Sequence, residues 1–455
     1  MLVSIVLARI LLPRDYGLIA LTSIFTNLSD ILIDGGFSTA LIQKESIDDY
    51  DYSAVFSISF LISSFLYAIL FCVAPFISVY YSSPELKNVL RVVGLTFFLQ
   101  SFTAVRNGIV IRNMQFRLLF VCNLVASITS GLIGIIAAKS NFGVWALVLQ
   151  RLTLQIVLTT LLFIKVKWRI RWRFDWARIR QMLSFSLGVV GSSLLNYMGG
   201  SIFSVVIGRA YSLTALGYYD KGSQLPMQFS LYTFGSMSNV LLPTLASSQS
   251  DLDRIKHIVR KVVGMTSFLI IPMMIGLSLV SKELIVLLFT SKWLPAVRIM
   301  QCACLYYLAT PYMLINIQVF FALGHSGLRV KTECIRLFMM IVSLMIFGFY
   351  FHSSIESMAF VSALIAVVVA ILTFFEVNKL IDYKLTELLI DVRKPVIASI
   401  LMGLTIMAME KSIPDNIIAA LALKVGFGVI IYGILALFFR MSELNDIIQL
   451  LSKRD

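Results

Sequence analysis

The stretch Leu7–Gly17, LARILLPRDYG, ends an apolar segment with an arginine, breaks at a proline and resumes at a tyrosine–glycine pair. A similar stretch, IGRAYSLTALG, follows two hundred residues later at Ile207–Gly217. In each stretch the arginine, Arg9 or Arg209, is followed by a glycine eight positions on. A cation at the end of an apolar segment, repeated once at the same spacing, predicts a duplicated membrane unit.

Composition decides the class of protein. Hydrophobic residues make up 59% of the chain and charged residues 14%, and the mean hydropathy is +0.90. Soluble domains carry more charge than this. The apolar runs have the length of the roughly 20-residue helices that cross a bilayer, and they lack the ten-residue alternation of barrel strands. We therefore expect an all-α polytopic membrane protein.

The apolar runs predict about fourteen transmembrane helices. They fall near residues 1–13, 17–43, 51–81, 86–111, 116–138, 142–164, 182–210, 216–246, 259–289, 294–322, 328–351, 356–379, 394–411 and 415–439. The breaks between them coincide with residues that stop helices, such as Pro13, Pro84, Pro295 and Pro414.

A second pair of similar stretches extends the repeat. Phe76–Val92 resembles Leu284–Ile299 and places Arg91 opposite Arg298. Helices one to six and seven to twelve are thus predicted to be two copies with the same orientation, which enclose a central cleft. The predicted division is an N-lobe at 1–164, a basic amphipathic cytoplasmic link at 165–180, a C-lobe at 181–380, and helices 13 and 14 with a tail at 381–455.

The repeat also predicts that the first helix is short. The seventh helix has about 25 residues before Arg209, whereas eight residues precede Arg9, too few for a span of about 20. We expect that roughly 15 to 25 residues of the first helix are missing from this chain, through a misplaced start or a truncation.

The basic residues gather in the links between apolar runs, as orientation signals do. If the first helix starts in the cytoplasm, the links on that side hold more than twice as many Lys and Arg as the outer ones. The link 165–180 carries seven cations and three tryptophans, which is typical of a segment on an anionic membrane surface. We therefore expect both termini inside, and we attribute the net charge of +14 to orientation and not to nucleic-acid binding.

Three polar residues share one face of the second helix: Asn27, Asp30 and Asp34 are spaced i, i+3, i+7. A carboxylate in lipid costs about 2.5–3.5 kcal/mol, so this face is expected to look into the protein or an aqueous cleft. One interpretation is a coupling site for Na⁺ or a proton. The other is a structural pair with an arginine.

Five arginines are candidate substrate contacts in a cationic cleft: Arg9, Arg91, Arg151, Arg209 and Arg298. Arg151 lies near the middle of the sixth helix, which holds no acidic residue. It is therefore expected to face inward, as a cavity cation or as the partner of Asp30 or Asp34. The other four lie toward the outer ends of their helices, where snorkelling to the interface is the alternative. Both copies keep both cations, although the positive-inside rule disfavours them there.

No residue pattern indicates an enzyme. The chain has no phosphate-binding GxxxxGK[ST] loop, no HExxH and no GxSxG. The cysteines and histidines are scattered, so neither a metal site nor a cofactor is predicted. On the eleventh helix, Arg329, Glu333 and Arg336 are spaced i, i+4, i+7, which predicts an intrahelical Glu–Arg pair that neutralises one charge.

Four stretches carry a resemblance to a known family. They are LARILLPRDYGLIAL (Leu7–Leu21), DGGFSTALIQK (Asp34–Lys44), APFISVYYSSPELKNVLRV (Ala74–Val92) and RNGIVIRNMQFR (Arg106–Arg117). They resemble the Wzx-like polysaccharide flippases, in particular the lipopolysaccharide, exopolysaccharide and colanic-acid exporters, within the multidrug/oligosaccharidyl-lipid/polysaccharide exporter superfamily. The resemblance implies fourteen helices with two six-helix lobes, and the short first helix departs from that pattern.

The resemblance further implies a flippase that moves an undecaprenyl-diphosphate-linked oligosaccharide across the bacterial cytoplasmic membrane by alternating access, for surface polysaccharide biosynthesis. Its partners would be membrane lipid, the lipid-linked glycan, and a polysaccharide polymerase with other assembly proteins. Arginine suits this substrate because the planar guanidinium binds phosphate oxygens bidentately.

Two alternatives stay open. A drug/cation antiporter of the same fold should have an acidic cleft, whereas the candidate cleft residues here are mostly arginine. A non-transporting membrane scaffold of a glycan-assembly complex would not move a labelled lipid-linked oligosaccharide across liposomes.

Overall fold

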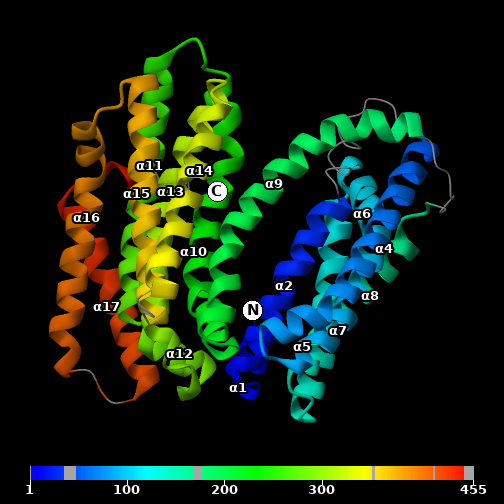
Figure 1. Cartoon of the computed structure of the whole chain (residues 1–455). Coiled ribbons are helices and arrows are strands. Elements are labelled where there is room, and N and C mark those ends of the chain that lie inside the picture. The colour runs from blue at the N-terminus through cyan, green and yellow to red at the C-terminus, as the bar shows by residue number, and fades with distance from the viewer. Residues whose placement is uncertain are drawn as a thin grey trace. The chain divides into compact units, whose positions relative to one another are not determined.

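The computed structural model describes residues 2–34, 48–168, 176–350, 354–412, 414 and 416–444, and within them every regular element is a helix. The chain divides into two compact units, Met1–Gly217 and Tyr218–Asp455, which are described separately (Figure 1). Most of the predicted motif at 34–44, the middle of the predicted link (169–175) and the end of the tail (445–455) lie outside the described residues.

The described residues of the first unit form eight helices that lie wholly within it. These are α1 (Leu2–Ile10), α2 (Pro13–Asp34), α4 (Asp49–Tyr80), α5 (Pro84–Gly94), α6 (Thr96–Arg112), α7 (Phe116–Lys139), α8 (Val144–Lys165) and α9 (Trp176–Ala210). The helices α7 and α8 form an antiparallel pair, and α6 packs on both α4 and α8. A cluster of buried apolar side chains that includes Phe56, Val105 and Leu162 joins α4, α6 and α8.

The start of α2 is fixed by local chemistry. Pro13 occupies the first helical position, where its missing N–H removes no hydrogen bond. The carboxylate of Asp15 accepts a hydrogen bond of 2.9 Å from the N–H of Leu12, just before the helix. The proline that breaks the opening sequence stretch therefore also begins the helix that carries Asn27, Asp30 and Asp34.

The two repeated sequence stretches contact each other. Gly17 lies near the start of α2, and Gly217, the last residue of the first unit, near the start of α10 (Leu213–Ala246). A Cβ atom at Gly17 would overlap the carbonyl oxygen of Leu213, and one at Gly217 would overlap that of Pro13. Each glycine thus faces the residue four positions before the other glycine. A side chain at either position would separate the two helix starts, which explains glycine at this repeated spacing.

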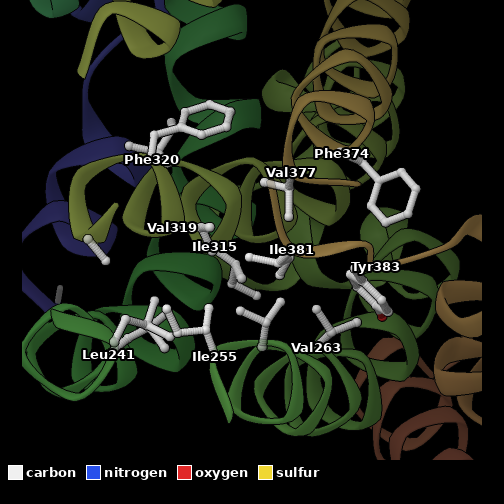
Figure 2. Close-up of a cluster of buried hydrophobic side chains, with 14 of the residues drawn as sticks. Leu241, Ile255, Val263, Ile315, Val319, Phe320, Phe374, Val377, Ile381 and Tyr383 are labelled. Carbon is white, nitrogen blue, oxygen red and sulfur yellow. The ribbon is translucent and has the colours of Figure 1, made fainter. Parts of the chain in front are cut away.

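The second unit continues from α10. It contains α11 (Leu252–Leu279), α12 (Ser281–Phe289), η1 (Ser291–Trp293), α13 (Ala296–Ala322), α14 (Ser326–Ser343), the π-helical η2 (Leu344–Tyr350), α15 (Ile355–Ile381), α16 (Leu385–Ala408), η3 (Met409–Ser412) and α17 (Ile417–Phe438). One apolar cluster of this unit is built from α10, α11, α13 and α15, and Figure 2 shows Ile255, Val263, Ile315 and Val377 pointing toward one another in it.

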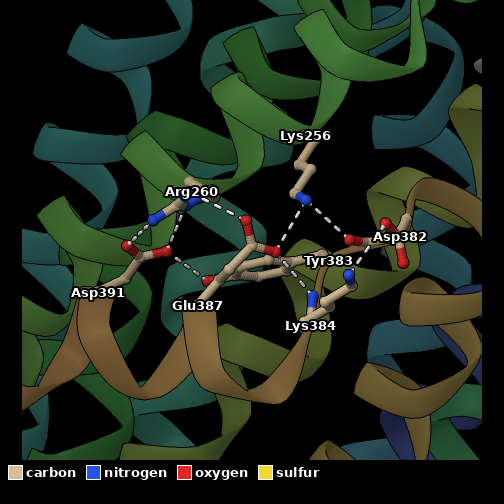
Figure 3. A network of polar contacts seen from close by, with 7 residues as sticks. All are labelled: Lys256, Arg260, Asp382, Tyr383, Lys384, Glu387 and Asp391. Carbon is tan, nitrogen blue, oxygen red and sulfur yellow. Dashed lines mark hydrogen bonds and ion pairs between the residues drawn. The ribbon is translucent and has the colours of Figure 1, made fainter.

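A polar network joins α11 to the start of α16. It consists of Lys256, Arg260, Asp382, Tyr383, Lys384, Glu387 and Asp391, and we call it the α11–α16 network (Figure 3). Arg260 Nη2 lies 2.7 Å from Asp391 Oδ1, and Lys256 Nζ lies 2.8 Å from Glu387 Oε2. The Tyr383 hydroxyl donates to Asp391 Oδ2 at 2.8 Å. Burial of the phenol and this hydrogen bond raise the pKa of Tyr383 above its ordinary value.

Nine helices within the described residues are long and apolar enough to cross a membrane. The prediction of an all-α polytopic membrane protein is confirmed, whereas the count of fourteen spans stays a prediction. The predicted span 86–111 falls within Pro84–Arg112, one of these nine, which is interrupted at Leu95 between α5 and α6. Two other predicted boundaries are wrong. The span 259–289 is divided at Val280 between α11 and α12.

The second wrong boundary is the start of helix 13, predicted at 394. In the structure α16 begins at Leu385, and its first two turns carry Glu387 and Asp391, which have cationic partners on α11. The predicted intrahelical Glu–Arg pair on α14 is confirmed, and the arginine that pairs with Glu333 is Arg336.

Each of the two similar stretches contains one residue with a side chain at positive φ. These residues are Ser82, after α4, with φ of 51°, and Thr290, after α12, with φ of 81°. Positive φ is unusual for residues with a side chain, so the two corners share a rare backbone feature as well as a sequence pattern.

Candidate functional site in the first unit

The polar face of α2 carries the predicted acidic residues. Asn27, Asp30 and Asp34 lie on this helix and are all partly buried. Ser23 and Thr26 precede Asn27 by one turn and by one residue, so hydroxyl groups and carboxylates occupy neighbouring turns of α2.

Arg151 of α8 lies against this face. Its Nη1 donates to Ser23 Oγ at 2.9 Å, and its Nη2 donates to Thr26 Oγ1. The charge of Asp30 acts on the guanidinium, but among the described residues no carboxylate lies within ion-pair distance of it. The hydrogen-bond acceptors that α2 offers Arg151 are therefore neutral hydroxyl groups. Its role as a cavity cation stays a prediction.

A third helix reaches the same point. The hydroxyl of Tyr197 on α9 donates to the backbone oxygen of Ser23 at 3.2 Å. The polar side chains that meet here come from α2, α8 and α9, and we call Ser23, Thr26, Asp30, Arg151 and Tyr197 the α2–α8 site.

A row of polar side chains continues from Arg151 along one face of α8. One turn on, Gln155 Nε2 donates to Gln100 Oε1 of α6 at 2.9 Å. After a further turn, the hydroxyls of Thr159 and Thr103 lie 2.8 Å apart. Sequence reasoning missed this row of polar residues. The spacing of Arg151, Gln155 and Thr159 at i, i+4, i+8 places them on one helix face and could have indicated a polar face of α8.

The remaining predicted cations of the first unit lie elsewhere. Arg91 donates from Nε and Nη2 to the carbonyl oxygen of Phe71, at 3.3 and 3.2 Å, and its guanidinium lies 3.8 Å from the centre of the Phe71 ring. Arg209 lies 5.0 Å from the centre of the Tyr80 ring and is exposed. Arg9 is exposed at the end of α1.

Arg298 belongs to the second unit, where it is exposed at the start of α13 and lines a pocket. Within the described part of the chain, no group of three His, Cys, Asp or Glu residues is placed to hold a metal ion.

Comparison with known proteins identifies the family. The model of a family described as "Polysaccharide biosynthesis protein" matches residues 6–298. The chain is 25% identical to the succinoglycan biosynthesis transport protein ExoT of Rhizobium meliloti over 288 residues, which are 63% of this chain and 58% of that protein. It is 24% identical to the teichuronic acid biosynthesis protein TuaB of Bacillus subtilis over 412 residues, which are 90% of this chain and 85% of that one. The match to ExoT thus spans less than two thirds of the length of ExoT.

Solved structures share the fold. The lipid II flippase MurJ in an inward closed conformation superposes with a TM-score of 0.77, at 17% identity, over 96% of this chain and 97% of that one. An inward-facing multidrug resistance MATE transporter of the MOP superfamily gives a TM-score of 0.67, at 14% identity, over 84% and 94%. At these identities the likeness concerns the fold alone.

Proposed function

Because the chain belongs to the polysaccharide biosynthesis protein family, we propose that it is a flippase for an undecaprenyl-diphosphate-linked oligosaccharide. It would move this lipid across the bacterial cytoplasmic membrane by alternating access and so supply surface polysaccharide biosynthesis. The similarity to ExoT, a succinoglycan biosynthesis transport protein, and the MurJ-like fold support this proposal. The step makes and breaks no covalent bond in the glycan.

The observation that carries the proposal is the environment of Arg151. Its guanidinium is held by the hydroxyls of Ser23 and Thr26 and is not paired with a carboxylate among the described residues. Phosphate oxygens are stronger acceptors for a guanidinium than hydroxyl groups are, because the hydrogen bond is then charged on both sides. A diphosphate can therefore replace these hydroxyls as the acceptor of Arg151.

The proposal assigns different roles to the other predicted residues. Arg9 and Arg209 are further contacts for the diphosphate, as they are exposed. Arg91 is the weaker candidate, since the carbonyl of Phe71 already accepts two of its hydrogen bonds. Asp30, with Asn27 and Asp34 on the same face, is proposed to couple transport to Na⁺ or protons, because it lies one helical turn from Thr26, the hydroxyl of which accepts a hydrogen bond from Arg151.

Reconstitution tests the proposal. The purified protein is placed in liposomes that contain undecaprenyl-diphosphate oligosaccharide with a fluorescent sugar, and the fraction of label open to an external quencher is followed in time. We expect the label to cross in liposomes with the protein and not in empty ones. A well-reconstituted protein that moves no label would support the scaffold alternative. Proton exchange stimulated by drugs, without glycolipid movement, would support the antiporter.

A further inference from the structure

The second unit contains a pocket of about 580 Å³ between α13, η2 and α15. Four polar side chains line it: Arg298 and Gln301 from α13, and Glu356 and Ser357 from α15. Its size falls within the roughly 300–1,000 Å³ of pockets for small ligands. One wall is the π-helical η2, and π-helical turns in proteins frequently accompany functional sites.

The pocket is lined by one positively and one negatively charged side chain, which do not form an ion pair with each other. Arg298 and Glu356 both line it, and among the described residues neither side chain makes an ion pair or a hydrogen bond. The carboxylate would repel a diphosphate, so the pocket is a poor site for the anionic part of a glycolipid. A cation and a carboxylate on one pocket instead suit a ligand whose groups both donate and accept hydrogen bonds.

The amide of Gln301 is oriented for such a ligand. Its Nε2 donates to Ser281 Oγ at 3.2 Å and to the carbonyl of Ser278 at 3.4 Å, at the corner between α11 and α12. These contacts occupy the amide nitrogen and leave the carbonyl oxygen as an acceptor. Phe347 and Phe360 add aromatic surface to the same pocket, and Phe360 is 48% exposed.

We propose that this pocket binds sugar residues of the glycan that the protein moves, an inference that rests on the proposed function. Sugar hydroxyls both donate and accept, and therefore satisfy Arg298, Glu356 and the Gln301 carbonyl together. The apolar C–H face of a pyranose can cover an exposed aromatic ring such as that of Phe360. In this assignment Arg298 contacts the glycan, whereas Arg151 contacts the diphosphate.

The native chain supplies a reporter for the test. Cys302 lines the pocket and is partly buried, whereas Cys72 and Cys334 are exposed on other helices. The protein in liposomes is alkylated with N-ethylmaleimide, and peptide mass spectrometry follows each cysteine. The probe is the oligosaccharide repeat unit released from the surface polysaccharide of the cells that make the protein. We expect about tenfold slower alkylation of Cys302 at a probe concentration about ten times Kd, because only the free site reacts.

Variants separate binding from general protection. Glu356→Gln and Gln301→Ala should remove the protection of Cys302 by the oligosaccharide. Protection is measured against the alkylation rate of the same variant without sugar, because the Glu356 charge acts on the Cys302 thiol. Asp253→Asn, an exposed carboxylate in the first turn of α11, is the matched control and should keep the protection. Protection of Cys72 and Cys334 to the same degree as Cys302 would mean that the sugar acts non-specifically, and would overturn the proposal.

Two further probes and the transport assay complete the test. Protection by phosphoethanolamine but not by sugar would overturn the proposal in favour of a zwitterionic lipid headgroup, and protection by inorganic phosphate alone would overturn it in favour of an anion. A protein that moves the glycolipid without any protection of Cys302 would refute the sugar pocket and leave the flippase intact. Protection without transport would support the pocket and refute the flippase.

Discussion

Arg151 in the first unit and Arg260 in the second are the same residue type, and both lie on helices that are long and apolar enough to cross a membrane. Their partners differ. Arg260 donates to both oxygens of Asp391, at 2.9 and 2.7 Å, and to Glu387 at 3.3 Å (Figure 3). Arg151 donates to the hydroxyls of Ser23 and Thr26.

This difference separates a structural arginine from one that can bind a ligand. In the α11–α16 network three cations meet three carboxylates, so the charge is balanced inside the protein. A ligand would have to break ion pairs to enter that network. The α2–α8 site offers neutral acceptors to its arginine, and exchanging them for an anion removes no ion pair. The kind of acceptor, more than burial, therefore decides which arginine we assign to the substrate.

The largest expected effect is the loss of transport in Arg151→Ala. Two charge-assisted hydrogen bonds of about 1.5 kcal/mol each correspond to a rate lower by on the order of a hundredfold. The initial rate of glycolipid movement in liposomes measures it, and Arg151→Lys, which keeps the charge but not the planar fork, should be intermediate. Arg117→Ala, an exposed arginine at the start of α7, is the matched control. An unchanged rate in Arg151→Ala would remove this arginine from the mechanism.

The opposite outcome is expected for Arg260→Ala, which should lower stability and spare transport. Asp391 loses its bidentate partner, and because Arg260 is 34% exposed we expect a loss of only about 1–2 kcal/mol after solvent screening. The apparent melting temperature in detergent measures it. Arg260→Ala combined with Asp391→Ala should cost less than the sum of the two single changes, since they remove the same interaction. Strictly additive losses would argue against the pairing as drawn in Figure 3.

Sequence reasoning predicted one side of this comparison better than the other. Arg151 stood out because its own helix holds no acid, and that reasoning needs only the helix boundaries. The α11–α16 network joins residues more than a hundred positions apart, such as Arg260 and Asp391, and depends on which helices are neighbours. Periodicity does not carry that information. The same limit hid the contact between Gln100 and Gln155, although each amide was visible in its own helix.

A smaller effect is expected for Asp30→Asn. The charge of Asp30 acts on Arg151 from within the α2–α8 site, and a partly screened charge pair contributes about 0.2–1 kcal/mol, or a two- to fivefold change in rate. If Asp30 couples transport to an ion, the variant should also lose the response of the rate to a sodium or proton gradient. Asp253→Asn should keep that response. A gradient response that survives in Asp30→Asn would assign coupling to another group.

The smallest effect is expected at the exposed edge of the α11–α16 network, in Lys384→Ala. Its ammonium lies 3.9 Å from Asp382, and the two side chains are 64% and 76% exposed. The N–H of Lys384 that donates to Glu387 at 2.9 Å belongs to the backbone and survives the change. An exposed pair of this kind is screened by salt, so we expect the stability to change by less than about 0.5 kcal/mol. Melting curves at low and high salt measure it. A loss of stability as large as that of Arg260→Ala would mean that the network acts as one unit. The exposed ion pair at its edge would then contribute as much to stability as the bidentate contact between Arg260 and Asp391.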